Sequence, residues 1–158
     1  MFSVEDNLDS VSVKSRTGFV ITLAGMPIAW KSTLQTKICL SSTEAESVAL
    51  SQALRVFVPL QEHLHFVGNE LELANGAKMK ISPISHVYED NAACLLLART
   101  KRLSPRTRHI TAKHWWSFQH IEKSSDAKQG IVIKKIDGKE NYANIFTKSV
   151  TPTVFKHL

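Results

Sequence analysis

Two acidic residues, Glu46 and Asp90, stand where carboxylates could perform chemistry in this chain of 158 residues. Glu46 falls on a stripe of apolar residues at helical spacing, where an unpaired carboxylate would be costly to bury. Asp90 directly follows a short apolar stretch typical of a strand, at the strand end where open α/β sheets place their sites. Carboxylate oxygens suit Mg²⁺, which keeps several waters and needs few protein ligands. Together the two residues predict the core of a magnesium site.

Each carboxylate also has a purely structural interpretation. Thr43 and Glu46 have the spacing of a capping box, in which a hydroxyl and a carboxylate satisfy amide donors at the start of a helix. Asp90 could instead be the N-cap of the helix that follows it. Neither position alone identifies a metal site, so both interpretations stay open at this point.

The surrounding sequence predicts the elements that would position these residues. Residues 17–23 and 28–31 have the composition of strands and flank a turn, which predicts an antiparallel hairpin. Helical spacing from residue 46 to residue 64 predicts a long helix, with a kink or break near residues 55–58 because Pro59 lies inside it. The remaining expectations are a short strand or strand end at 37–40, strands at 86–89 and 130–136, and helices at 92–98, 110–123 and 141–148. Such an order predicts a single mixed α/β layer domain over residues 1–158.

The charge of the chain favours a polyanionic partner. Lys and Arg number 20 against 14 Asp and Glu, and residues 99–113 contain no acidic residue at all. A solvated surface is the alternative for this stretch, but its length favours contact with a nucleic-acid backbone. Its candidate contacts are Arg99, Lys101, Arg102, Arg106, Arg108, His109 and Lys113.

The remaining composition indicates an intracellular protein. Cys39 and Cys94 cannot form a disulfide framework and lack the paired spacing of a zinc site. The chain shows neither a secretory signal nor an apolar stretch long enough for a membrane helix. We therefore expect a location in a cytoplasmic particle or the nucleus.

Several strings, in matching order and spacing over nearly the whole chain, resemble the ribonuclease H domain of copia-type retrotransposon polyproteins. Ser-Ser-Thr-Glu-Ala-Glu and Ile-Phe-Thr-Lys are among the most specific of them. The matching strings are residues 14–20, 28–32, 40–46, 89–93, 106–110 and 143–148.

The resemblance implies a ribonuclease H-like three-layer fold, with a mixed five-stranded sheet and helices on both faces. It also implies hydrolysis of the RNA strand of RNA–DNA hybrids by two Mg²⁺ or Mn²⁺ ions held by four carboxylates. By motif, Glu46 is the helix glutamate and Asp90 the aspartate that ends the fourth strand. The implied partners are the hybrid and the reverse transcriptase region of the same polyprotein.

Two of the four carboxylate positions depart from the family. Asn144 replaces the aspartate of the Ala-Asp-Ile-Phe-Thr-Lys string, and Val4 aligns with the first aspartate, with Asp6 a weak substitute. An amide keeps an acceptor oxygen but loses negative charge, so metal affinity and rate should fall. The first strand of the family is also expected to be truncated.

These departures leave alternatives open. The chain is either an impaired ribonuclease H or a catalytically inactive domain of the same fold that binds nucleic acid or has decayed. A structural remnant without a nucleic-acid role is the weaker third interpretation.

Overall fold

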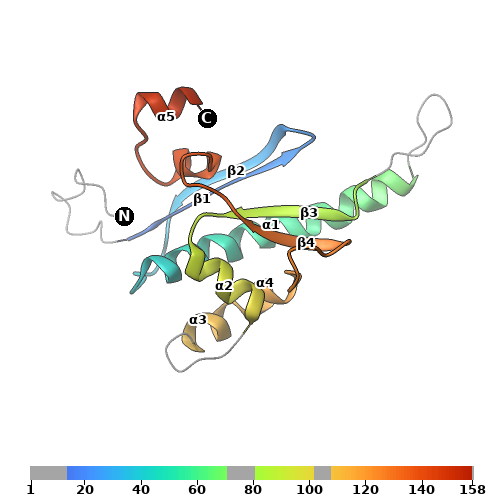
Figure 1. Cartoon of the computed structure of the whole chain (residues 1–158), viewed down its shortest axis with the longest axis horizontal. Helices are drawn as coiled ribbons and strands as arrows, with labels where there is room; N and C mark the ends of the chain where they lie inside the picture. The colour runs from blue at the N-terminus through green and yellow to red at the C-terminus, as the bar shows by residue number, and fades with distance from the viewer. Residues whose placement is uncertain (1–13, 71–80, 102–107, 158) are drawn as a thin grey trace.

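A computed structural model describes residues 14–70, 81–101 and 108–157 of the chain (Figure 1). Val4, Asp6 and the expected truncated strand lie outside these residues. The elements are, in chain order, β1 (Arg16–Leu23), β2 (Met26–Leu34), α1 (Ser42–Glu70), β3 (Ile84–Glu89), α2 (Ala92–Thr100), α3 (Arg108–Lys113), α4 (Trp115–Gln119), β4 (Gly130–Lys135), the 3₁₀ helix η2 (Tyr142–Phe146) and α5 (Pro152–His157).

Strands β1 and β2 form the predicted antiparallel hairpin. The turn between them needs positive φ angles, which Ala24 (51°) and Gly25 (82°) adopt. The additional strand expected at residues 37–40 is wrong, because this segment has no strand conformation. The buried side chain of Gln35 organises it instead, donating to the Ala45 carbonyl at 2.9 Å and accepting from the Cys39 thiol at 3.0 Å.

Helix α1 begins earlier than the capping box at Thr43 and Glu46 predicts. The Ser41 hydroxyl accepts from the Glu44 amide at 3.1 Å, and the Glu44 carboxylate accepts from the Leu40 amide at 3.0 Å. These two bonds cap the helix two residues upstream of the expected box, so that box is wrong. The expected break before Pro59 does not occur either, because α1 continues through it to Glu70.

The second sheet pairs β3 with β4 in parallel, and α2, α3 and α4 form the connection between them. The helix expected over residues 110–123 is divided into α3 and α4 at His114. The core between α1, these helices and the β3–β4 sheet is apolar and closely packed. Its buried members are Leu50, Leu54, Val58, Cys94, Leu97, Ala98, Ile110, Phe118, Ile121, Ile131 and Ile133.

The described strands form two two-stranded sheets, where the sequence predicted one sheet of five strands. The mixed α/β character is therefore confirmed, while the five-stranded sheet is not found among the described residues. Only four strands lie among the described residues, and β1 and β3 do not pair with each other. Residues of both strands instead line a groove, whose volume is about 1170 Å³.

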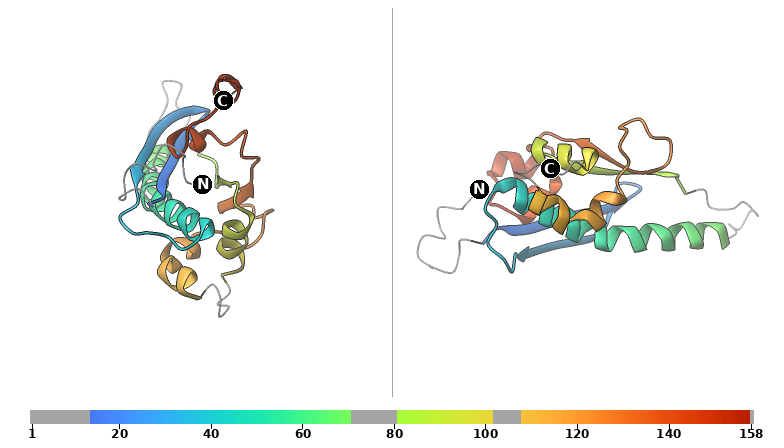
Figure 2. Two further views of the ribbon diagram at one scale, coloured as in Figure 1. Left: turned by 90° about the vertical axis from the view of Figure 1, so that its left-hand side faces the viewer. Right: turned by 90° about the horizontal axis from the view of Figure 1, so that it is seen from below.

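Helix α1 runs along the length of the molecule (Figure 2). Its buried residues Leu50, Leu54 and Val58 belong to the apolar core. The stripe predicted from the sequence begins with residues 46, 50, 53 and 57, and all four line the groove. Leu50 belongs to both the groove and the core, and Phe57 packs against the core, so the predicted stripe lies where the two meet.

The 3₁₀ helix η2 is docked on the hairpin at Gly18 and Ser32. A Cβ added at Gly18 would lie 2.5 Å from Thr147 Cγ2 and 2.9 Å from Phe146 Cβ. The Ser32 hydroxyl donates to the Phe146 carbonyl at 2.7 Å. Close contact without a side chain at Gly18 therefore sets the position of η2 relative to β1.

We expect Gly18→Ala to lower the free energy of unfolding by about 1–3 kcal/mol, because the added methyl group overpacks this contact. The additional change Thr147→Ser removes the nearest methyl group and should restore part of the loss. Thr147→Ser alone is the control, and urea denaturation measures all three variants. Equal stability of Gly18→Ala and the unchanged chain would contradict this account of the docking.

Candidate functional site

Glu46, Asp90 and Asn144 come from different elements and line the same groove near the end of β3. Glu46 lies in the first part of α1, Asp90 follows β3, and Asn144 belongs to η2. The charge of Asp90 raises the pKa of Glu46, so the two carboxylates are close enough to interact. A Cβ added at Gly138 would lie 3.3 Å from Asp90 Oδ2 and 3.7 Å from Asn144 Nδ2, which places both side chains beside one glycine.

Neither Glu46 nor Asp90 takes part in a helix cap, so both carboxylates are available to the site. The N-cap of α2 is Asn91, whose side chain accepts from the amides of Ala93 and Cys94 at 3.0 Å each. The interpretation of Asp90 as the N-cap is therefore wrong. Glu46 likewise takes no part in the cap of α1, which Ser41 and Glu44 form.

Glu89 is a further acidic side chain at this site, and the sequence analysis missed it. It is buried at the last position of β3, accepts from the Asn91 amide at 2.9 Å and receives a hydrogen bond from the Cys94 thiol. Burial raises the pKa of Glu89 to about 8, with smaller contributions from the charges of Glu46 and Asp90. The sequence does contain a signal for Glu89, because it is a second acidic residue at the end of an apolar strand, directly before Asp90.

The site concentrates negative charge where water is scarce. Burial raises the pKa of Glu46, the charge of Asp90 raises it further, and Lys148 opposes both effects. Removing carboxylates from water and placing them side by side favours either a bound proton or a bound cation. A hard divalent cation with oxygen ligands fits Glu46 and Asp90.

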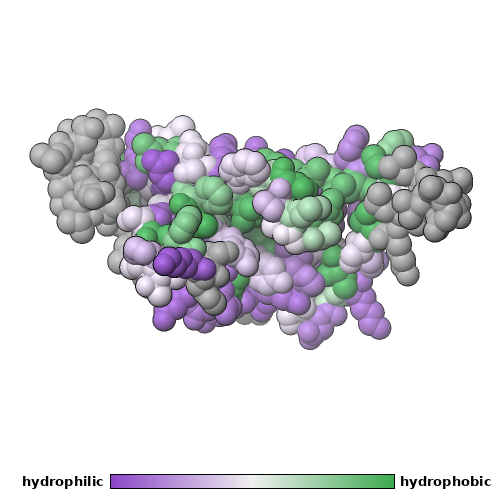
Figure 3. Space-filling model, turned by 90° about the horizontal axis from the view of Figure 1, so that it is seen from above, coloured by the Kyte–Doolittle hydropathy of each residue, from purple (hydrophilic) through white to green (hydrophobic). Residues whose placement is uncertain are grey.

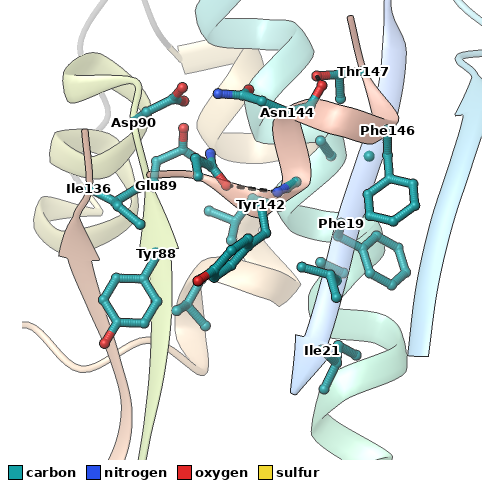
Figure 4. Close-up of a pocket in the computed structure, with 18 of the residues that line it drawn as sticks. Phe19, Ile21, Tyr88, Glu89, Asp90, Ile136, Tyr142, Asn144, Phe146 and Thr147 are labelled. Atoms are coloured by element: carbon teal, nitrogen blue, oxygen red, sulfur yellow. Dashed lines mark hydrogen bonds between the residues drawn. The ribbon is translucent and has the colours of Figure 1, made fainter. Parts of the chain in front are cut away.

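Asn144 differs from the two carboxylates, because its side-chain amide is engaged in a hydrogen bond within the fold. Its buried amide nitrogen donates to the Gly138 carbonyl at 2.6 Å. Figure 4 shows the nitrogen end of this amide turned toward Asp90. Within the described ranges no group of three or more His, Cys, Asp or Glu residues is arranged to hold a metal ion. The described site thus brings the carboxylates of Glu46 and Asp90 together with the amide of Asn144.

The residues of the predicted basic segment differ in their hydrogen bonds and in their exposure. Arg99 donates to the Ile133 carbonyl at 2.6 Å, so one guanidinium nitrogen is used inside the domain. Lys101 Nζ donates to the Gln119 carbonyl at 3.4 Å, and burial together with the nearby charge of Lys123 lowers the pKa of Lys101.

Three residues of the basic segment, Arg108, His109 and Lys113, belong to α3. Arg108 and His109 are exposed at the start of α3, and the side chain of Lys113 is not described. Arg102 and Arg106 lie outside the described residues.

We expect Glu89 to make the free energy of unfolding fall as pH rises. Between the unfolded pKa near 4.5 and the folded pKa of about 8, the unfolded chain releases a proton that the folded chain retains. Glu89→Gln should remove this fall, which is on the order of 2–4 kcal/mol between about pH 5 and pH 9. Urea denaturation across this range measures the effect, with the exposed Glu62→Gln as the control. Parallel pH profiles for Glu89→Gln and the unchanged chain would contradict the assignment.

Comparisons with known proteins relate the chain to a retrotransposon polyprotein. It is 29% identical over 143 residues to the Retrovirus-related Pol polyprotein from transposon TNT 1-94 of Nicotiana tabacum. The matched region is 90% of this chain and 10% of that polyprotein, so the chain spans about a tenth of its relative. No protein-family model and no solved structure matches the chain. Of the helices described, none has the length and apolar character to cross a membrane. The similarity thus supports an origin in a retrotransposon polyprotein.

Proposed function

We propose that the chain is a ribonuclease H-like domain that binds RNA–DNA hybrid and hydrolyses its RNA strand slowly, with Mg²⁺ or Mn²⁺. The observation that carries the proposal is the convergence of Glu46, Asp90 and Asn144 in one groove from distant parts of the sequence. Each of these residues belongs to a string that resembles the ribonuclease H domain of copia-type elements. The relationship to a retrotransposon polyprotein supports the same assignment.

Within this proposal, Glu46 and Asp90 hold the divalent ion. When bound, such an ion would supply a Lewis acid for the scissile phosphate. Lys148, which lowers the pKa of Glu46, keeps that carboxylate closer to its ionised, metal-binding form. In this proposal the exposed Arg108 and His109 of α3 contact a phosphate backbone that extends beyond the site.

We expect hydrolysis of the RNA strand to be slow for two reasons. Asn144 contributes an amide where the resembling family has a carboxylate, and its nitrogen is engaged with the Gly138 carbonyl. Two carboxylates and an amide compensate less positive charge than four carboxylates do, so a second divalent ion would be held weakly. Since two-ion hydrolysis stabilises both the attacking and the leaving oxygen, weak occupancy of one position lowers the rate.

We expect the purified chain to cleave the labelled RNA strand of a hybrid duplex in Mg²⁺ or Mn²⁺. Cleavage should fall at least about tenfold in Glu46→Gln and in Asp90→Asn, because each change removes a charged ligand. Double-stranded DNA of the same sequence is the substrate control, and Glu62→Gln, an exposed site elsewhere on α1, is the matched protein control. If both site variants cleave as fast as the unchanged chain, the cleavage does not depend on Glu46 and Asp90, and the proposed site is wrong.

A second candidate function is hybrid binding without hydrolysis. The hydrogen bond from Asn144 to Gly138 favours it, because the amide then stabilises the fold at a position that hydrolysis would use for a metal ligand. Salt-dependent binding of the hybrid with no cleavage in either metal would support this candidate. Neither binding nor cleavage would contradict both functions.

We expect Asn144→Asp to increase metal-dependent cleavage and to lower stability when no metal is present. The new carboxylate adds a metal ligand, but without a metal it places an oxygen where the amide nitrogen donates to the Gly138 carbonyl. The cost of losing this buried donor is about 1–3 kcal/mol of unfolding free energy, and Mg²⁺ should restore part of it.

Asn141→Asp is the matched control for this variant. Asn141 caps the same 3₁₀ helix by accepting from the Ala143 amide at 3.1 Å, a bond that aspartate also makes. Thermal unfolding with and without Mg²⁺, together with the cleavage assay, separates the two variants. If Asn141→Asp changes stability and cleavage as much as Asn144→Asp does, the effect arises from the added negative charge and not from a new metal ligand.

A further inference from the structure

Two residues of the hairpin region hold the elements that carry the candidate site, although neither residue lines the groove. They are Ser32, near the end of β2, and Gln35, directly after β2. The backbone of this short segment is fixed to β1 and to the residue before it. Ser32 pairs with Gly18, and the Gln35 amide donates to the Ser15 carbonyl at 2.8 Å. The side chains of Ser32 and Gln35 are therefore attached to a hydrogen-bonded ladder.

The side chain of Gln35 reaches from this ladder to the first turn of α1. It is 3% exposed, and its nitrogen donates to the Ala45 carbonyl at 2.9 Å and to the Thr17 hydroxyl at 3.2 Å. Its oxygen accepts from the Cys39 thiol at 3.0 Å. A buried amide that is bonded at both ends has little freedom to move. Because Ala45 directly precedes Glu46, Gln35 ties the backbone beside Glu46 to β1.

Ser32 makes the corresponding contact with η2. Its hydroxyl donates to the Phe146 carbonyl at 2.7 Å and accepts from a guanidinium nitrogen of Arg16 at 3.3 Å. A serine hydroxyl has one hydrogen to donate, and the bond from Arg16 leaves that hydrogen directed at Phe146. Phe146 is the last residue of η2, the element that carries Asn144. The two elements on either side of the site are thus bonded to one segment of four residues.

Hydrogen bonds define positions more narrowly than apolar packing does. Apolar surface gathers along the middle of the face shown in Figure 3, and Phe19 and Ile21 of β1 are buried. Apolar burial stabilises this assembly, but it has no preferred direction. Hydrogen bonds weaken steeply when their distances and angles change. Side chains that bind a metal must be held within about 0.5 Å of their productive geometry, so directional bonds of this kind matter at the site.

We propose that Ser32 and Gln35 are positioning residues, which set the distance between Glu46 and Asn144 by bonding α1 and η2 to the same hairpin. Gln35 holds the start of α1, and Ser32 holds η2. A change at either residue displaces one side of the site and leaves its own side chains unaltered. The consequence for metal binding rests on the proposed function, whereas the consequence for the placement of η2 does not.

Ser32→Ala tests the contact with η2 in the full chain. The backbone amides of Asn144 and Thr147 bond within this segment, and we expect them to exchange with solvent about two- to tenfold faster in the variant. Ser32→Thr keeps the hydroxyl and should restore slow exchange. Ser82→Ala is the matched control, because the exposed Ser82 hydroxyl also donates to a carbonyl, that of Ile84, at 3.1 Å. It should leave the amides of η2 unchanged.

Mn²⁺ binding without hybrid tests the link to the site, measured by electron paramagnetic resonance of the free ion. Asn144→Asp should tighten Mn²⁺ binding, and adding Ser32→Ala should remove about two- to tenfold of that gain, because the new carboxylate is held less firmly. Adding Ser32→Thr should preserve the gain. A role of Ser32 in stability alone would lower the midpoint of thermal unfolding, but its effect on Mn²⁺ binding would not depend on the residue at position 144.

Gln35→Met gives the same comparison for Glu46. Methionine has a similar length but cannot donate to the Ala45 carbonyl, so we expect Mn²⁺ binding to weaken about two- to tenfold. Gln61→Met is the matched control, because it removes a bond of 2.8 Å to the Ser85 hydroxyl farther along α1. The serine variants keep the test decisive if Gln35→Met does not fold.

Three outcomes would overturn the assignment. The first is unchanged exchange of the η2 amides in Ser32→Ala. The second is an equal gain in Mn²⁺ binding from Asn144→Asp with and without Ser32→Ala, which would show that Ser32 holds η2 without positioning a metal ligand. The third is an absence of Mn²⁺ binding in every variant, which contradicts the proposed function and the metal role of both residues together. In that case the exchange comparison still decides whether Ser32 holds η2.

Discussion

Packing against helix α1 holds together two sheets that share no hydrogen-bonded strand pair among the described residues. The hairpin lies on one part of α1, and the β3–β4 sheet is attached through α2 and through a bond from Gln61 to Ser85 of 2.8 Å. Because β1 and β3 do not pair, apolar burial and a few side-chain bonds set the distance between them. The groove, and the site at its end, exist because of this arrangement.

The candidate site shows how neighbouring residues divide structural and chemical roles. Asn91 caps α2 and Glu44 takes part in the cap of α1, so neither cap uses Asp90 or Glu46, whose charges interact. Burying acidic groups together is unfavourable unless protons, donors or cations compensate them. In this chain a raised pKa at Glu89 and an amide at Asn144 provide part of that compensation.

Local patterns predicted most of the elements, and the errors came from interactions that local patterns do not contain. The hairpin, β3, β4 and α2 follow from residue composition and turn residues. The capping position of α1 was misjudged by two residues because Ser41, Thr43, Glu44 and Glu46 offer competing boxes, between which only packing decides. The helix was expected to kink or break near residues 55–58, but it continues through Pro59, because burial of Leu54 and Val58 on its core side outweighs one lost backbone bond. The five-stranded sheet was expected from resemblance, and the two described sheets leave the position between β1 and β3 without a strand.

The sequence by itself determined the hairpin, the apolar stripes of α1 and the placement of Glu46 and Asp90 at the ends of elements, because these depend on residues close together in the chain. It also showed that Asn144 stands where the resembling family has an acid. Only the tertiary structure decided that Glu89 is buried beside these carboxylates, that the Asn144 amide nitrogen meets Gly138, and that two strand edges face a common groove. Burial, charge proximity and edge pairing depend on segments far apart in the chain, so no local pattern of residues contains them.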